Sequence, residues 1–358
     1  MNAALPSPAF WQGKRVFLTG HTGFKGGWLA LWLSALGAEV TGYALPSATT
    51  PNLFELARVE ETLTSIIADL RDPNALQTAL TAARPQIILH LAAQALVADG
   101  YTDPAGTYAT NVMGTINLLQ AARQLPDLKA IVVVTSDKCY ENVESTHAYI
   151  ESDPLGGYDP YASSKACAEI VTASWRRSFF GQPGQSAALA TARAGNVIGG
   201  GDWAAHRLVP DLLAAFAANE TAILRNPHAV RPWQHVLEPL AGYLRLAEKI
   251  TADATFARAW NFGPELEDCV SVGELAEQLH KLWQGSRYTT QASPLPHEAA
   301  LLRLDATCAK ERLGWRPRWR LPEALRQTVA WHQAWRDGKD MQDFCRQQIG
   351  QYSRSNHG

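Results

Sequence analysis

The strongest constraint on the fold is a glycine-rich turn between a short apolar run and an apolar helix. Residues 15–19 (RVFLT) favour a β-strand and are followed by the spacing Gly20-x-x-Gly23-x-x-Gly26. Good helix formers cover 28–36, and a second β-forming run covers 39–44. This order predicts a βαβ unit. Because glycine carries no side chain, a phosphate can approach such a turn, where the helix N-terminus offers free N–H groups.

The rest of the chain extends this pattern. Near-continuous apolar runs at 64–68, 87–91 and 130–135 are typical of strands covered on both faces. A helical stretch covers 106–125, and a further strand is expected over 187–198. Alternating strands and helices predict an α/β fold, a Rossmann-type doubly wound parallel sheet.

A smaller region is expected in the C-terminal half, where the alternation loosens and prolines become frequent. We predict a mixed α/β substrate domain there, interleaved with the first domain. The nucleotide-binding domain would comprise 1–195 plus about 231–263, and the substrate domain about 196–230 plus 264–358.

Composition excludes several classes of protein. The chain is 46% apolar and 18% charged, with a formal net charge of −2, which argues against a nucleic-acid partner. No membrane span is expected, and the N-terminus lacks the order of a signal peptide, which favours the cytoplasm. Five dispersed cysteines without a CxxC pair indicate reduced thiols, and ten scattered histidines without HExxH favour no metal.

A second motif, Tyr161-x-x-x-Lys165, places a phenol and an ammonium on one helix face. A lysine near a tyrosine stabilises the phenolate and lowers the tyrosine pKa from ~10, so that the phenol can act as a base near neutrality. Ser136 stands at the end of the strand expected over 130–135. These three side chains are therefore candidates for proton transfer.

Together, the glycine turn, Ser136, Tyr161 and Lys165 resemble the short-chain dehydrogenase/reductase superfamily. His90-Leu-Ala-Ala93 and Thr110-Asn-Val-Met-Gly114 resemble its extended branch, which acts on nucleotide sugars. The resemblance implies NAD, although no acidic residue or arginine ends the second strand, so the turn alone leaves NAD against NADP open. The implied cofactor contacts are Gly20, His21, Thr22, Gly23, Phe24, Lys25, Gly26, Asp69, Leu70, Leu91, Ala92, Ala93, Thr135, Tyr161 and Lys165.

The tetrad Thr135-Ser-Asp-Lys138, within TSDKCYEN, resembles the cytidine-diphosphate-glucose (CDP-glucose) 4,6-dehydratases. That resemblance implies three steps. Tyr161, with Ser136 and Lys165, takes the 4-hydroxyl proton as a hydride leaves carbon 4. Lys138 then removes the carbon-5 proton while Asp137, kept protonated, protonates the leaving 6-hydroxyl. The hydride finally returns to carbon 6. Arginine could not serve at 138 because it does not deprotonate in proteins.

The same resemblance implies the remaining contacts and partners. The partners are CDP-glucose and further copies of the chain, as a homodimer or dimer of dimers built on helices near 106–124 and 160–180. The product of this reaction is expected to serve deoxysugar biosynthesis for lipopolysaccharide O-antigen. The substrate-binding candidates are Gln94, Asn196, Arg207, Arg231 and His297.

Other functions stay open at this point. A dehydratase for a deoxythymidine- or guanosine-diphosphate sugar would use the same residues. A nucleotide-sugar 4-epimerase or decarboxylase would have no use for Asp137 and Lys138. A catalytically silent NAD-binding regulator would not need Tyr161 or Lys165.

Overall fold

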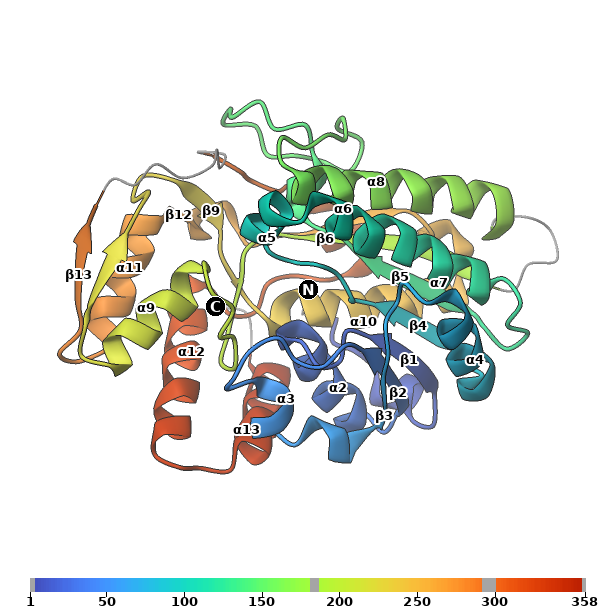
Figure 1. Cartoon of the computed structure of the whole chain (residues 1–358), viewed down its shortest axis with the longest axis horizontal. Helices are drawn as coiled ribbons and strands as arrows, with labels where there is room; N and C mark the ends of the chain where they lie inside the picture. Colours follow the sequence, from blue (N-terminus) through green and yellow to red (C-terminus); the bar gives the residue numbers. More distant parts are fainter. Residues whose placement is uncertain (1–3, 181–186, 292–300, 356–358) are drawn as a thin grey trace.

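The computed structural model describes residues 4–180, 187–291 and 301–355. Its centre is a seven-stranded sheet in which every neighbouring pair is parallel (Figure 1). In spatial order the strands are β11 (Ala259–Phe262), β6 (Ala188–Ala194), β5 (Ala130–Val134), β4 (Ile87–His90), β1 (Arg15–Thr19), β2 (Glu39–Ala44) and β3 (Thr64–Ile67). The chain therefore runs outward from β1 in both directions, and the predicted doubly wound α/β fold is confirmed.

Successive residues of the central strands enter two different cores. Val16 and Leu18 of β1 pack into one apolar cluster, while Phe17 between them packs into the other. In β4, Leu89 faces the first cluster and Ile88 the second. Because side chains alternate along a strand, both faces of the sheet are covered. That is why these strands are almost continuously apolar.

Helices cover the two faces. On the first lie α2 (Phe24–Ala35) and α10 (Leu237–Ala252), and on the second lie α4 (Pro73–Ala83), α7 (Gly114–Ala122) and α8 (Pro160–Trp175) (Figure 1). The predicted helix over 106–125 is α6 (Pro104–Tyr108), a π-helical turn η2 (Ala109–Met113), and α7.

Two of the strand predictions need correction. Residues 64–67 do form β3, but most of the strand is exposed, and Ile67 is 51% accessible. The reason is position, because β3 is the last strand at the edge of the sheet. The strand predicted over 187–198 is broken after Ala194, and β7 (Val197–Ile198) pairs with β10 (Gln234–His235) outside the main sheet.

A smaller mixed α/β region lies beside the carboxyl ends of the sheet. It has its own apolar cluster, to which α9 (Leu208–Ala217), α11 (Val272–Leu282) and α12 (Leu321–Arg336) contribute. Its paired strands are β8 (Thr221–Leu224) with β13 (Arg287–Thr290), in parallel, and β9 (Val230–Pro232) with β12 (Cys269–Ser271), antiparallel.

The C-terminal helix returns to the first region. Helix α13 (Met341–Arg354) lies beside α2 (Figure 1). The two helices pack through Tyr352 and Trp32, whose rings meet edge to face with centroids 5.6 Å apart. The remaining short elements are α1 (Pro8–Trp11), α3 (Leu53–Leu56), η1 (Val59–Thr62), α5 (Val97–Thr102), η3 (Asp137–Cys139), η4 (Arg176–Phe180), η5 (Ala254–Phe256), η6 (Leu266–Asp268) and η7 (Ala309–Leu313). Over the described ranges, no helix has the length and apolar character needed to cross a membrane.

Candidate active site

The glycine turn joins β1 to α2 and leaves the helix N-terminus open. Gly20 has a φ of +82°, a left-handed conformation that glycine adopts without strain. A Cβ on Gly26 would lie 1.9 Å from the carbonyl oxygen of Gly20, so the helix can pack on the strand only with glycine there. Gly23 caps α2 without any side-chain hydrogen bond, and a Cβ there would touch only that carbonyl, at 3.4 Å. The backbone around Gly23 is therefore accessible to a ligand.

The side chains of the turn brace the adjoining strands. His21 is buried, its Nε2 lies 2.8 Å from Ser65 Oγ, and its ring fills the space that a Cβ on Gly42 would need. Burial lowers the pKa of His21 to about 4, so the imidazole is neutral. Thr22 Oγ1 donates to the carbonyl of Leu45. His21 Nδ1 is buried and has no hydrogen-bond partner among the described residues.

The loop after β4 is held by the hydroxyl of Thr19. Thr19 Oγ1 accepts from the backbone N–H groups of Leu91 and Ala92, at 3.1 and 3.0 Å, and lies 2.7 Å from His90 Nδ1. The loop from 91 to 93 consequently lies directly beside the glycine turn, where a Cβ on Gly20 would meet Ala92 N at 2.8 Å. Leu91 and Ala92 are thus placed beside the turn, and contact of this loop with a cofactor stays a prediction.

Asp69 and Leu70 follow β3, where the chain leaves the edge of the sheet. The Asp69 carboxylate accepts from the Arg71 guanidinium, and this hydrogen bond lowers the pKa of Asp69. Leu70 is buried and packs against Gly114. The Asp69 carbonyl accepts from the Tyr43 hydroxyl at the end of β2.

Ser136, Asp137 and Lys138 form a single turn at the carboxyl end of β5. Ser136 caps η3 by accepting from the Lys138 N–H at 3.2 Å, and its hydroxyl donates to Asp137 Oδ1 at 3.0 Å. Asp137 is 3% exposed, and its Oδ2 has no hydrogen-bond partner among the described residues. Burial raises the pKa of this carboxyl against the opposing effect of the Lys138 ammonium. The direction of this shift agrees with the expected role of Asp137 as a proton donor.

Tyr161 and Lys165 project from α8 toward the same turn. Burial raises the pKa of Tyr161 to about 12, while a hydrogen bond with Ser136 lowers it. Burial lowers the pKa of Lys165 to about 8, and its Nζ lies 3.5 Å from the Val134 carbonyl. The expectation of a lowered tyrosine pKa is wrong for the protein alone, because desolvation of the phenolate outweighs the favourable contacts.

A cluster of cations lies opposite this turn. Burial lowers the pKa of Lys25 to about 8, and the charges of Arg207 and Lys165 lower it further. Arg207 pairs with the buried carboxylate of Asp202 at 3.0 Å. Arg231 is 3% exposed and close enough to Asp137 to lower that carboxyl's pKa. The positive charges therefore lie around the turn that carries Asp137 and Lys138.

The remaining substrate candidates differ in what holds them. The Gln94 side chain is engaged internally, with its amide bonded to Leu96 and Thr107, and its backbone N–H donates to Asn111 Oδ1. Asn196 lies at the break between β6 and β7, where its carbonyl accepts from Gln234 N. His297 falls outside the described residues.

Sequence reasoning overlooked a buried ion pair beneath the site. Glu169 Oε2 accepts from Arg193 Nη2 at 2.8 Å, and both side chains are 3% exposed. Glu169 also accepts from the hydroxyls of Thr135 and Thr191. Its spacing of four residues from Lys165 on α8 was a usable signal. The other partner, on β6, is distant in sequence.

Known proteins with similar sequence share nearly the full length of the chain. The family model described as GDP-mannose 4,6 dehydratase matches residues 17–328. A CDP-glucose 4,6-dehydratase from Salmonella typhimurium is 49% identical over 348 residues, covering 96% of this chain and 97% of the relative.

Among the described residues, no group of three or more histidine, cysteine, aspartate or glutamate side chains is placed to hold a metal ion.

Solved structures with the same fold include more than one activity. A dTDP-glucose 4,6-dehydratase from Streptomyces venezuelae, solved with NAD, is 24% identical with a TM-score of 0.76, covering 92% of this chain and 99% of that one. A UDP-glucose 4-epimerase from Thermotoga maritima, solved with UDP-glucose, is 22% identical with a TM-score of 0.77, covering 89% and 98%. The fold alone therefore does not separate dehydratase from epimerase. By its sequence, the chain belongs to the GDP-mannose 4,6 dehydratase family.

Proposed function

We propose that this protein is a lyase that dehydrates CDP-D-glucose to CDP-4-keto-6-deoxy-D-glucose, with NAD as its cofactor. The observation that carries the proposal is the turn at the end of β5. There a buried carboxyl with a raised pKa, Asp137, and the side chain of Lys138 lie beside Ser136 and Tyr161. The identity to the Salmonella typhimurium enzyme supports the cytidine nucleotide.

The first region fits a dinucleotide. The turn at Gly23 exposes backbone N–H groups at the start of a twelve-residue helix, where the helix dipole favours a pyrophosphate. Thr135 and the loop from 91 to 93 lie at the carboxyl ends of the neighbouring strands, which is where open parallel sheets bind their ligands. When bound there, NAD accepts a hydride from the sugar and later gives it back.

Tyr161 takes part in the first step as a base. It accepts the proton of the 4-hydroxyl as carbon 4 becomes a ketone. Ser136 hydrogen-bonds the phenol and favours its anion. Lys165, whose pKa burial lowers to about 8, stands one helical turn away to stabilise the phenolate or supply a proton. Because Tyr161 alone has a pKa near 12, it can act as a base only if positive charge is close during turnover.

Asp137 and Lys138 carry out the elimination. The ketone acidifies carbon 5, whose proton passes to the Lys138 amine, and the electron pair forms the bond between carbons 5 and 6. The 6-hydroxyl departs as water with the proton of Asp137. Return of the hydride to carbon 6 and of a proton to carbon 5 completes the product. The sum is loss of one water, with no net oxidation of the sugar.

The cations near the turn suit an anionic substrate. The Arg207 side chain is two-thirds buried and is paired with Asp202, so its guanidinium is oriented before a substrate binds. Arginine pairs with phosphate through two parallel hydrogen bonds. We therefore propose that Arg207 and Arg231 bind the diphosphate. We also propose that Gln94 and Asn196 contact the substrate.

The proposal is tested by incubating the protein and NAD with the glucose diphosphates of cytidine, deoxythymidine, guanosine and uridine, each followed by mass spectrometry. We expect loss of one water from the cytidine compound. Loss of water from another nucleotide sugar alone would correct the base. Epimerisation at carbon 4 without loss of mass would refute the dehydratase.

Several wider properties belong to the same proposal. We propose a cytoplasmic homodimer or dimer of dimers that supplies a deoxysugar for lipopolysaccharide O-antigen. Exposed apolar side chains on the helices of the second face, Met113 and Ile170, support an interface there. We also propose two interleaved domains. The nucleotide-binding domain comprises 1–195 plus about 231–263, and the substrate domain comprises about 196–230 plus 264–358. Light scattering of the purified chain tests the oligomeric state.

A further inference from the structure

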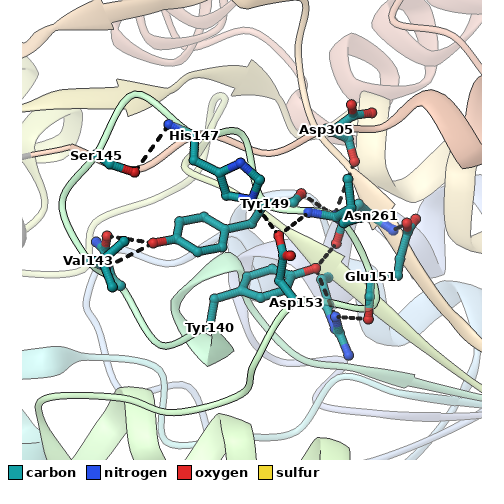
Figure 2. Close-up of polar contacts among 12 residues, drawn as sticks. Tyr140, Val143, Ser145, His147, Tyr149, Glu151, Asp153, Asn261 and Asp305 are labelled. Atoms are coloured by element: carbon teal, nitrogen blue, oxygen red, sulfur yellow. Dashed lines mark hydrogen bonds and ion pairs between the residues drawn. The ribbon is translucent and has the colours of Figure 1, made fainter.

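The hydroxyl of Tyr140 lies at the centre of a buried polar network. It donates to Asn261 Oδ1 at 2.7 Å and accepts from Arg193 Nη1 at 2.8 Å, and Tyr140 is 1% exposed (Figure 2). Tyr140 comes two residues after Lys138, immediately beyond η3. The hydroxyl therefore ties the far end of the turn that carries Asp137 and Lys138 to this network, in addition to the backbone hydrogen bonds of Cys139 with Gly156 and of Glu141 with Pro154.

On one side the network leads back to the start of the same turn. Arg193 pairs with Glu169, and Glu169 Oε1 accepts from Thr135 Oγ1 at 2.5 Å. Thr135 directly precedes Ser136, and Glu169 lies on α8 four residues after Lys165. The turn is thus anchored at both ends, at Thr135 and at Tyr140, to one buried ion pair.

On the other side the network reaches residues 301–305, which pair with the strand that carries Arg231. Asn261 Nδ2 donates to the carbonyls of Tyr149 and Asp305, at 2.8 and 3.1 Å (Figure 2). The segment 301–305 also bridges to Val230, the neighbour of Arg231, through Leu301. Tyr140 therefore links the catalytic turn to the strand that carries Arg231.

We propose that Tyr140 is a positioning residue for the elimination step, acting by holding Asp137 and Lys138 through its hydroxyl. This inference rests on the proposed function. Without the hydroxyl, the turn keeps its anchor at Thr135, next to Ser136, but loses the side-chain anchor that follows Lys138, and backbone hydrogen bonds and ring packing are left to hold that end. Ser136 and Tyr161 should then still support oxidation at carbon 4, while the acid and base of the elimination lose their alignment.

The substitution Tyr140→Phe isolates this hydroxyl. The ring contacts do not depend on it, because Tyr140 stacks on Tyr149 with centroids 5.0 Å apart and lies 4.9 Å from the Arg193 guanidinium carbon. Tyr352→Phe is the matched control. Tyr352 is also fully buried and donates to a buried carboxylate, Glu238 Oε2, at 2.7 Å, but it lies on α13, away from the catalytic turn.

The experiment is a single turnover of CDP-glucose with NAD-loaded protein, in which two signals are followed. Near-ultraviolet absorbance reports reduced nicotinamide, and quenched mass spectrometry reports water loss. In Tyr140→Phe we expect the absorbance to rise at close to the wild-type rate and then persist, because water loss slows by about 100-fold, the cost of a small misplacement of reacting groups. Tyr352→Phe should show wild-type kinetics for both signals.

The outcomes separate the two proposals. If the wild-type protein loses no water from CDP-glucose, the proposed function fails. If the wild type turns over but Tyr140→Phe slows both signals equally, or neither, the positioning role is wrong. If Tyr140→Phe gives no folded protein, Asn261→Ser replaces it, because this substitution removes the acceptor of the same hydroxyl. We again expect water loss alone to slow, and equal slowing of both signals, or of neither, would show that the positioning role is wrong.

Discussion

Glu169 and Arg193 form an ion pair at 2.8 Å that is sealed between α8 and β6, with both side chains 3% exposed. The pair joins the helix that carries Tyr161 and Lys165 to the strand end that carries Ser136, through Thr135. Burying two charges is costly unless their remaining polar atoms are satisfied. Here two threonine hydroxyls donate to the Glu169 carboxylate, whereas Arg193 Nε has no hydrogen-bond partner among the described residues. The elements that carry Ser136, Tyr161 and Lys165 are therefore joined by one buried polar network.

Breaking this pair should strongly destabilise the protein. In Glu169→Gln the Arg193 guanidinium stays buried without its counter-charge, and we expect a loss of about 3–5 kcal/mol in the free energy of unfolding. Urea denaturation measures it. The control is Glu61→Gln, which removes a surface pair with Arg58 at 3.4 Å and should cost less than about 1 kcal/mol. Equal effects of the two substitutions would show that the buried pair does not stabilise the fold.

Lys138→Arg separates binding from elimination. The guanidinium keeps the positive charge but cannot give up a proton, so it cannot act as the base. We expect unchanged NAD affinity, with water loss slower by at least about 100-fold. Lys339→Arg, an exposed position, should behave as wild type. Formation of the 4-keto-6-deoxy product at near wild-type rate in Lys138→Arg would remove Lys138 from the mechanism.

Two glycines of the turn should respond differently to alanine. Gly26→Ala places a methyl group 1.9 Å from a backbone oxygen, so the helix must move off the strand and folded protein should be lost. Gly23→Ala meets only a contact at 3.4 Å, so it should fold but bind NAD more weakly. Gly350→Ala, which meets only the flexible end of Arg354, is the control. Expression yield and calorimetric NAD binding check this, and a well-folded Gly26→Ala protein with normal NAD affinity would contradict it.

Glu238 makes stability depend on pH. Burial raises its pKa from 4.5 to about 7, although it accepts from the backbone N–H groups of Arg318 and Trp319. Between these pH values the folded protein holds a proton that the unfolded chain releases, so stability falls as pH rises from about 4.5 to 7. This contribution is about 3 kcal/mol. Denaturation across that range should show a flatter pH dependence for Glu238→Gln, and an unchanged slope would exclude Glu238 as its source.

Much of the fold follows from local pattern. The glycine turn, the strands over 15–19, 39–44 and 130–134, and the apolar helix after the turn are predictable because each depends on residues close in sequence. The edge position of β3 is not, because its apolar residues resemble those of a buried strand and only the topology leaves it exposed.

The site divides in the same way. Spacing and resemblance predict Ser136, Tyr161 and Lys165. In the structure, Tyr161 and Lys165 on α8 lie against the turn that begins at Ser136. The pairing of Glu169 with Arg193 and the shared hydroxyl of Tyr140 join residues from separate elements, so no local pattern predicts them. The high pKa of Tyr161 likewise depends on burial, which only the folded chain determines.

The most direct test of the account follows one hydrogen atom. CDP-glucose carrying deuterium at carbon 4 is converted by the protein with NAD, and the product is examined by nuclear magnetic resonance. We expect the deuterium at carbon 6 of the 4-keto-6-deoxy product, with no build-up of reduced nicotinamide, because the hydride removed at carbon 4 returns within the same turnover. Deuterium retained at carbon 4, or released with reduced nicotinamide, would contradict the proposed dehydration.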